Sequence, residues 1–395
     1  MSEGAMYQFQ FNPAVFVRDG SPRITADAGA LLLREMDDRL DITRRLAKVL
    51  IDPRDPAKTR YQDAVLLRQL LYAFALGHTR QDDADRIAHD PAFRVAVWDR
   101  SGDRPLNERL ASQPSASRLI KRLADPRSPG NLEALRDTLA GGVLAHQRVH
   151  ADARVQFGVV DTDTFPIEAH GKQPCAAYNG YYKKTIYLPL VAGFSARGDY
   201  NAPRLGDGFL HAILREGNAA SAAGAEGFLR NASAKARELA VTVCHRLDAG
   251  FADAKIYNLL DGLGDRFVCR LRENAVLRRL AEPHLVRPAH RPPKEGYLHA
   301  VELTGYRPEG WDKEYRVVLV VVDEPLSDGR LDFGPRIFFL ATNLKADSFD
   351  SMATLDLMLF AQDCGFSSQK SVLTQINPLV NNPGVYLLPP VIPIN

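Results

Sequence analysis

The stretch Val155-Gln-Phe-Gly-Val-Val-Asp-Thr-Asp-Thr164 contains a short apolar run that ends at two carboxylates, Asp161 and Asp163. A run rich in Val and Phe is typical of a buried strand in the interior of a mixed sheet. Carboxylates at the end of such a strand can bind a hard divalent cation, because Mg²⁺ prefers oxygen ligands and usually takes one or two protein carboxylates. On this stretch alone, an Asp- and Thr-rich turn that caps the next element is an equal alternative.

A second predicted strand, Ala240-Val-Thr-Val-Cys-His-Arg-Leu-Asp248, also ends at a carboxylate. Predicted helices at 222–239 and 253–263 and predicted strands at 209–214 and 266–271 surround it, which indicates a βαβ arrangement. Two aspartates at strand ends in one mixed sheet favour a two-metal phosphoryl-transfer site, since strands hold metal ligands rigidly.

The composition narrows the class of protein. The chain has 395 residues, 45% hydrophobic and 25% charged, which predicts a globular protein of two or three domains. Its 50 Lys and Arg against 48 Asp and Glu neither require nor exclude a nucleic acid partner. The four cysteines are far apart and show no zinc-binding spacing. Without an apolar leader or a run long enough to span a membrane, we expect a cytoplasmic protein that has no membrane partner.

The first 150 residues are predicted to be helical throughout. Predicted helices cover 25–50, 61–76, 82–87, 91–97 and 112–123, and Asn131 is expected to cap a last helix that runs to about Val149. The helix at 112–123 carries Arg118, Lys121 and Arg122, which suits contacts with DNA phosphates. A solvated helix face is the more common role of such residues.

The region from 283 to 345 has a different character. Residues 298–304, 315–322 and 336–342 are predicted to be antiparallel strands. Earlier in the chain, Lys183 and Lys184 lie near the start of another predicted strand, in the second half of the stretch from Tyr178 to Leu190, and they are further candidates for DNA contacts.

Several motifs in a consistent order now carry a resemblance to a known family. They are Leu110-Ala-Ser-Gln-Pro-Ser-Ala-Ser-Arg118, Asp161-Thr-Asp163 followed by His170-Gly-Lys-Gln173, Gly180-Tyr-Tyr182 with Tyr187-Leu-Pro-Leu190, Leu214-Arg-Glu-Gly-Asn218, Asp248-Ala-Gly-Phe251 and Phe339-Leu-Ala-Thr-Asn343. Over about residues 20–345 the chain resembles the DDE transposases of bacterial insertion sequences, in the branch with a β-rich insertion.

The resemblance implies an α/β fold: an RNase H-like mixed sheet, a helical N-terminal domain and an inserted antiparallel β subdomain. The expected divisions are 1–150 for the helical DNA-binding region, 151–282 for the catalytic core, 283–345 for the insertion and 346–395 for the tail. It also implies that Asp163 and Asp248 are the first two catalytic acids and bind Mg²⁺ or Mn²⁺. Asp161 is the rival for the first position, and the spacing to His170 favours Asp163.

The chain departs from the family pattern at its end. The family places a third acid, a Glu, in a Tyr-x-x-Arg-Gly-x-x-Glu signature, but no Glu, Arg or His follows Arg336. Asp356 or Asp363 can stand in only as a shorter side chain without the flanking motif. We therefore expect that 346–395 is an aberrant tail, frame-shifted or substituted from about Met358, in place of the last catalytic helix.

Two functions follow from the resemblance. The first is the cleavage of double-stranded DNA at transposon terminal inverted repeats and the transfer of the cut strands into target DNA. This activity requires that the catalytic acids support catalysis although the third acid is missing. The alternative is a catalytically dead DNA-binding protein that occupies transposon ends or inhibits an intact transposase. A homodimer is expected in either case, because two DNA ends must be brought together.

Overall fold

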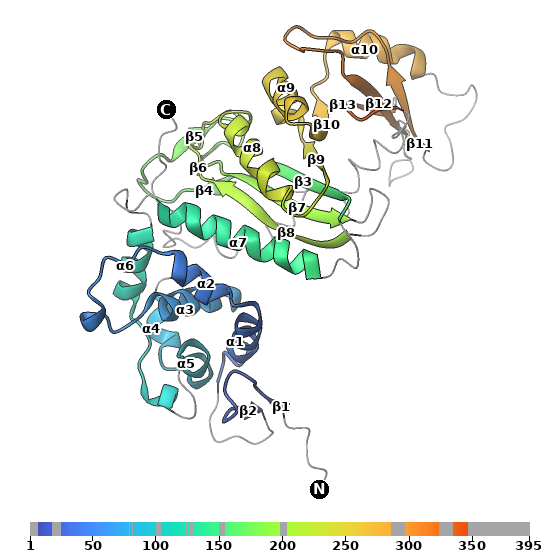
Figure 1. Cartoon of the computed structure of the whole chain (residues 1–395). Coiled ribbons are helices and arrows are strands. Elements are labelled where there is room, and N and C mark those ends of the chain that lie inside the picture. Colours follow the sequence, from blue (N-terminus) through green and yellow to red (C-terminus); the bar gives the residue numbers. More distant parts are fainter. Residues whose placement is uncertain are drawn as a thin grey trace. The chain divides into compact units, whose positions relative to one another are not determined.

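The chain folds into two compact units, the first built mainly from residues 1–142 and the second mainly from residues 143–372. Figure 1 shows the computed structural model. It describes residues 7–17, 25–78, 80, 82–99, 104–123, 125, 130–149, 155–197, 204–285, 297–323 and 335–346. In these ranges no helix is both long and apolar enough to cross a membrane.

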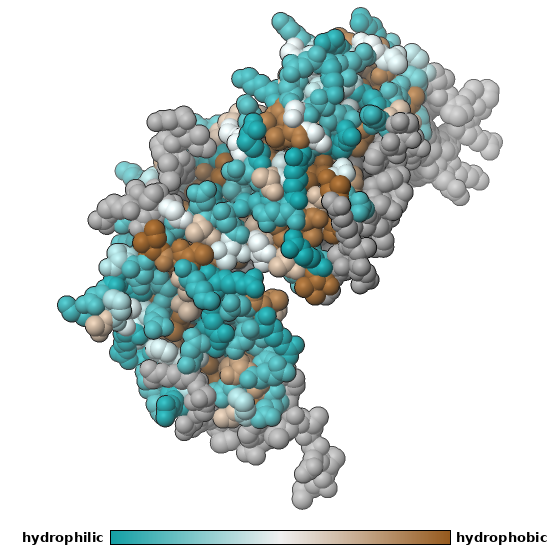
Figure 2. Space-filling model, viewed as in Figure 1, coloured by the Kyte–Doolittle hydropathy of each residue, from teal (hydrophilic) through white to brown (hydrophobic). Residues whose placement is uncertain are grey.

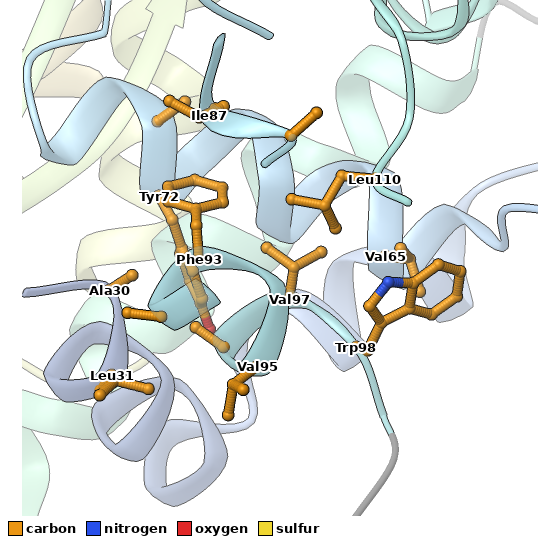
Figure 3. Close-up of a cluster of buried hydrophobic side chains, with 14 of the residues drawn as sticks. Ala30, Leu31, Val65, Tyr72, Ile87, Phe93, Val95, Val97, Trp98 and Leu110 are labelled. Atoms are coloured by element: carbon orange, nitrogen blue, oxygen red, sulfur yellow. The ribbon is translucent and has the colours of Figure 1, made fainter. Parts of the chain in front are cut away.

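The first unit is helical, as predicted, apart from a short antiparallel pair of β1 (Tyr7–Gln8) and β2 (Phe16–Val17). Its helices are α1 (Gly29–Leu40), α2 (Ile42–Val49), α3 (Asp63–Ala75), α4 (Asp83–Ile87), α5 (Pro91–Val97), α6 (Gln113–Leu123) and the first part of α7 (Gly130–Val149). Aromatic and aliphatic side chains from α1, α3 and α5 form its core, with Phe93, Val97 and Leu110 fully buried (Figure 3).

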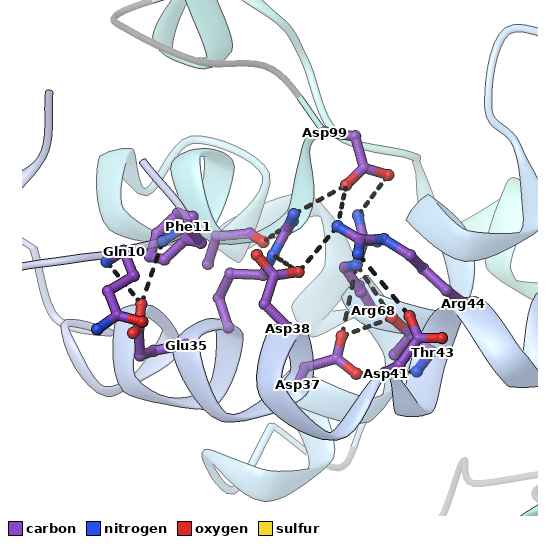
Figure 4. A network of polar contacts seen from close by, with 12 residues as sticks. Gln10, Phe11, Glu35, Asp37, Asp38, Asp41, Thr43, Arg44, Arg68 and Asp99 are labelled. Carbon is purple, nitrogen blue, oxygen red and sulfur yellow. Dashed lines mark hydrogen bonds and ion pairs between the residues drawn. The ribbon is translucent and has the colours of Figure 1, made fainter. Parts of the chain in front are cut away.

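The single helix predicted for 25–50 is in fact two helices, because Asp41 adopts a left-handed backbone with φ of 54°. The cause is local: the Asp37 carboxylate accepts hydrogen bonds from the Thr43 N–H (2.8 Å) and hydroxyl (2.5 Å). Next to this turn the fully buried Arg68 donates to Thr43 and forms an ion pair with Asp99 (2.8 Å) (Figure 4). Burial of Asp99 opposes ionisation, but Arg68 and Arg34 outweigh it and hold its pKa below the usual value.

A second expectation for this unit was wrong. Asn131 lies inside the first turn of α7, which begins at Gly130, and does not precede it. Its buried side-chain oxygen accepts a hydrogen bond from the Ile51 N–H (2.8 Å), so it anchors the segment after α2.

The second unit is built on a mixed eight-stranded sheet in the order β11-β12-β13-β10-β9-β3-β7-β8. Its first part contains β3 (Phe157–Thr164), β7 (Leu190–Arg197), β8 (Arg204–Ile213), β9 (Thr242–Leu247) and β10 (Arg266–Leu271). β3, β7 and β8 pair antiparallel, whereas β9 and β10 follow parallel to β3. This is the RNase H-like mixed sheet that the sequence predicts.

Helices cover this sheet. α8 (Ala225–Ala236) packs against β3, β7 and β8, and α9 (Ala254–Gly262) packs against α8 and β10. The end of α7 contacts the sheet through Gln147, whose side chain donates to Phe194 O and accepts from Ala196 N (both 3.1 Å). Because both faces are covered, β3 is buried through its first four residues.

The three strands predicted for 283–345 are present and antiparallel: β11 (Tyr297–Leu303), β12 (Arg316–Asp323) and β13 (Arg336–Thr342). They extend the core sheet, because β13 pairs with β10. Asn343 secures this junction: it accepts from Phe267 N (3.0 Å) and donates to Asp265 O (2.8 Å).

Three elements of the second unit lie outside the strands predicted from the sequence. One is β7, whose Ala, Gly and Ser residues have low strand propensity. Another is the short helix α10 (Ala275–Ala281), which Asn274 caps by accepting from Val276 N and Leu277 N. The third is the pair of short strands β4 (Ile167–Glu168) and β5 (Ala177–Asn179), which flank β6 (Lys184–Tyr187), the strand predicted in the second half of 178–190, in a small three-stranded sheet. Figure 2 shows a visible face that is mostly hydrophilic, with hydrophobic areas between.

Candidate active site

The pairing of β3 with β9 brings Asp163 and Asp248 together at the carboxyl ends of these two interior strands. The parallel ladder ends with Asp161 opposite Arg246 and Thr162 opposite Leu247. Asp163 and Asp248 are the next residues along β3 and after β9. Asp163 is still in β3, paired with Val191 of β7, and Asp248 directly follows β9, so the two lie side by side near the carboxyl ends of neighbouring strands. In α/β sheets this end is where ligands bind.

Asp161, the alternative to Asp163 as the first catalytic acid, forms an ion pair with Arg246. Both of its carboxylate oxygens accept from the Arg246 guanidinium, through Nε and Nη2. The Arg246 side chain is only 4% exposed, and this ion pair balances its charge. Asp161 is therefore neutralised within the sheet, and the pairing favours Asp163 as the metal ligand.

Asp163 has an environment that opposes its negative charge. Burial raises the pKa of Asp163 to about 7; the hydrogen bond from the Thr164 N–H to Oδ1 (2.6 Å) acts against this rise, and the charges of Asp248 and Asp161 add to it. A carboxyl group that resists ionisation next to a second carboxylate is a common feature of cation sites, because the cation supplies the missing positive charge.

Asp248 follows β9 and begins a short turn, Ala249–Phe251, in which its Oδ1 accepts from the Gly250 N–H (2.8 Å). Nearby protein atoms remove part of the water around its carboxyl group and raise the pKa of Asp248, while Arg272 and Arg270 act in the opposite direction. Both arginines are exposed at the end of β10. They add positive charge beside the aspartates, and the sequence motifs did not single them out.

Arg215 positions the loop behind Asp248. This buried side chain donates to Leu188 O through Nε (3.0 Å) and, through Nη1, to the carbonyls of Ala220, Ser221 and Ala223 (3.1, 2.9 and 2.8 Å). Ser221 in turn lies against Gly250, where a Cβ would be 2.7 Å from its side chain and 2.9 Å from Asp248 Oδ1. The motif Leu214-Arg-Glu-Gly-Asn218 therefore supports the second aspartate from behind.

Tyr182 is a further residue of this site. Burial raises the pKa of Tyr182, and the negative charges of Asp163 and Asp248 add to the rise. The sequence marked it only as part of the Gly180-Tyr-Tyr182 motif, with no assigned role.

The side chains predicted to contact DNA differ in solvent exposure and in ion pairing. On α6, Arg118 and Lys121 are exposed. Arg122 is only 11% exposed and pairs with Asp63 and with Asp52 (2.8 Å). Its guanidinium holds α6 to the rest of the first unit, so we exclude Arg122 from the DNA contacts proposed below. In the second unit, Lys183 and Lys184 are both exposed at the β5–β6 turn.

The sequence matches the family model described as "Transposase DDE domain group 1" over residues 8–353. The chain belongs to this transposase family. The resemblance to DDE transposases is thereby confirmed, whereas an origin in a bacterial insertion sequence remains a prediction. No curated protein is similar enough in sequence to count as a match. Among solved structures, the chain is similar to a piggyBac transposase in a synaptic complex with hairpin DNA, with a TM-score of 0.35 and 12% identity over 89% of this chain and 72% of that chain.

DDE transposases generally use a divalent metal ion, and the two aspartates suit one. Asp163 and Asp248 offer carboxylate oxygens at one sheet edge, the ligand type and number that Mg²⁺ usually takes from protein. Within the described ranges, no group of three or more His, Cys, Asp or Glu side chains is close enough to hold a metal. The candidates for a third acid, Asp356 and Asp363, lie outside the described residues, as does the tail from 347 to 395.

Proposed function

We propose that this transposase cuts DNA at transposon ends and joins the ends to target DNA, with Asp163 and Asp248 as ligands of Mg²⁺ or Mn²⁺. The observation that carries the proposal is the side-by-side position of these aspartates at the carboxyl ends of β3 and β9 within a DDE transposase. Asp163 and Asp248 would hold the metal through their carboxylate oxygens.

Bound there, the metal would activate a water or a 3′-hydroxyl and stabilise the charge on the leaving oxygen. The protein's own part is to hold the ligands and the DNA. The Gly250 N–H and Arg215 fix the Asp248 loop. Arg270 and Arg272 are placed to attract the phosphates near the aspartates. Because Asp163 must lose its proton to become a ligand, metal binding should release a proton and should weaken as pH falls below about 7.

For double-stranded DNA we propose Arg118, Lys121, Lys183 and Lys184 as phosphate contacts, with transposon inverted repeats and target DNA as partners. Exposed cations of this kind give salt-dependent binding without reading the sequence. Joining two ends requires two active sites, which favours a homodimer. We keep the cytoplasm as the expected location, and the divisions 1–150, 151–282, 283–345 and 346–395 as a proposal.

The alternative is a transposase that binds DNA but no longer cuts it. The observation that favours it is in the sequence: no Glu follows Arg336, so the family's third acid is missing unless Asp356 or Asp363 replaces it.

A plasmid cleavage and strand-transfer assay separates the two. The substrate carries the DNA that flanks the gene, with Mg²⁺ or Mn²⁺ present. Activity that Asp163→Asn and Asp248→Asn each abolish supports the enzyme. The matched control is Asp253→Asn, because Asp253 lies nearby but only caps α9 by accepting from Lys255 N, a role that Asn also fills. Retarded DNA without any cleavage supports the alternative, and activity that survives both site variants refutes the assignment of the aspartates.

A further inference from the structure

The turn between β5 and β6 presents aromatic rings and cations at the surface. We call Asn179-Gly-Tyr-Tyr-Lys-Lys184 the tyrosine hairpin. Tyr181 is 84% exposed, and Lys183 and Lys184 beside it are exposed as well. Tyr178, at the base of the hairpin, is 63% exposed. Large aromatic rings that protrude this far, next to cations, are typical of surfaces that bind nucleic acid bases.

The backbone of the tyrosine hairpin is held in one conformation. Asn179 Oδ1 accepts from the N–H groups of Tyr181 (3.0 Å) and Tyr182 (3.3 Å), and its Nδ2 donates to Gly217 O (2.7 Å). The strand β6 that follows the hairpin lies so close to Gly217 that a Cβ there would be 2.0 Å from Ile186 O. A fixed backbone lowers the entropy that a ligand must overcome, because the exposed ring is already positioned.

The hairpin also lies next to the candidate active site. The rings of Tyr181 and Tyr182 meet edge to face, with centroids 4.9 Å apart. Tyr182 interacts electrostatically with both Asp163 and Asp248. The segment from Arg215 to Ser221 links the hairpin to the site, because Gly217 accepts from Asn179 of the hairpin and Ser221 lies against Gly250 beside Asp248.

A base offers its face to a protein ring only when it has left the stack of a duplex. We infer that the tyrosine hairpin binds an unpaired nucleobase next to the phosphate that is cut, with Tyr181 stacking on the base and Lys183 contacting an adjacent phosphate. The inference rests on the proposed function, because it uses the same two aspartates to locate the DNA. It adds a contact between Tyr181 and an unpaired base to the phosphate contacts already proposed for Lys183 and Lys184.

The test measures binding without metal, in EDTA, so that catalysis plays no part. Two DNA probes share one sequence: a blunt duplex, and a duplex with a short unpaired thymidine overhang. A third probe carries 2-aminopurine in the overhang, whose fluorescence falls when it stacks on a ring. The full chain is compared with Tyr181→Ala and Tyr181→Phe, and thermal melting checks that each variant is folded, as expected for so exposed a side chain.

We expect the unaltered protein to bind the overhang duplex more tightly than the blunt one and to quench 2-aminopurine. Tyr181→Ala should lose about tenfold or more in affinity for the overhang duplex, the loss typical of one base stack. The same variant should bind the blunt duplex unchanged, and Tyr181→Phe should retain both affinity and quenching because its ring remains.

Three results would overturn the inference in distinguishable ways. If the unaltered protein binds both duplexes equally, the hairpin does not recognise an unpaired base, although the proposed transposase function stands. If Tyr181→Ala weakens both duplexes alike, Tyr181 contacts duplex DNA instead. If the unaltered protein binds neither duplex at low salt, the inference fails together with the proposed DNA partner.

Discussion

Asp161 and Arg246 face each other across the parallel strands β3 and β9 and form an ion pair through two hydrogen bonds. The pair lies one register step before the end of the ladder, where Asp163 and Asp248 emerge. This ion pair gives different roles to two aspartates that are only two residues apart in the sequence. Asp161 balances the charge of the buried Arg246, and Asp163 remains available to bind a cation.

This arrangement predicts opposite effects of two similar substitutions. Asp161→Asn should lower the free energy of unfolding by about 2–4 kcal/mol, because it leaves the nearly buried Arg246 without its counter-charge. Asp163→Asn should cause no such loss, since no cation of the described chain pairs with Asp163. Urea unfolding of both variants measures this. Equal destabilisation by the two would contradict the assignment.

The raised pKa of Asp163 predicts how stability depends on pH. Because this carboxyl keeps its proton up to about pH 7 in the folded chain but only to its ordinary 3.8 when unfolded, the folded state binds more protons between these values. Its contribution to stability is thus present at low pH and is lost as pH rises through about 7. Asp163→Asn removes this dependence.

In EDTA, Asp163→Asn should therefore stabilise the chain by roughly 1–3 kcal/mol near pH 8 and by clearly less near pH 5. Urea unfolding at the two pH values measures the difference. A stabilisation of equal size at both would show that Asp163 ionises normally in the folded protein.

The close contact between Gly217 and the strands β5 and β6 predicts that this glycine tolerates no side chain. In Gly217→Ala the new Cβ would lie 2.0 Å from Ile186 O and 2.5 Å from Ala177 O, so the strands must separate. We expect a loss of about 2–3 kcal/mol in the free energy of unfolding.

The matched control for this glycine is Gly227→Ala, in an exposed part of α8 where a Cβ would meet nothing within 4 Å. It should stabilise the chain by about 0.5 kcal/mol, because alanine favours helix. Destabilisation of similar size in both variants would mean that the close approach at Gly217 is not the cause.

The three basic residues of α6 are predicted to have two different roles: Arg122 stabilises the fold, and Arg118 and Lys121 contact DNA. Arg122→Gln should destabilise the protein by about 1–2 kcal/mol, since Asp63 and Asp52 lose a partner and only Arg54 remains to them. Arg118→Gln and Lys121→Gln should leave stability within about 0.5 kcal/mol but each reduce the salt dependence of DNA binding by about one unit of slope. Thermal melting and binding titrations at several salt concentrations test both. The division is wrong if Arg122→Gln alters only the salt slope.

The tail carries a prediction that needs only the gene. If residues after about Leu357 result from a frame shift, another reading frame of the same DNA should encode Tyr-x-x-Arg-Gly-x-x-Glu. Restoring that frame should raise cleavage activity, because it returns the third acid. The absence of the signature from every frame would favour a complete site in which Asp356 or Asp363 takes part.

Much of the fold could be predicted from local patterns. β10 and β13 lie where the apolar runs place them, and β3 and β9 begin and end within two residues of prediction, because each is a short run of buried, mostly apolar residues. β7 could not be found this way, since its small residues carry little strand preference and its position comes from pairing with β3. The break at Asp41 likewise depends on hydrogen bonds to the Asp37 side chain, which hydrophobic periodicity does not reveal.

For the site, the sequence by itself determined that Asp163 and Asp248 end two strands, because apolar runs followed by carboxylates are local features. Only the tertiary structure decided that those strands are neighbours in register and that Arg246 neutralises Asp161. It also showed that Arg270 and Arg272 act on the charge of Asp248, and that both aspartates act on the pKa of Tyr182. The physical reason is that strand pairing and ion pairing join residues separated by tens to about a hundred positions, whereas propensity and periodicity act only between residues close along the chain.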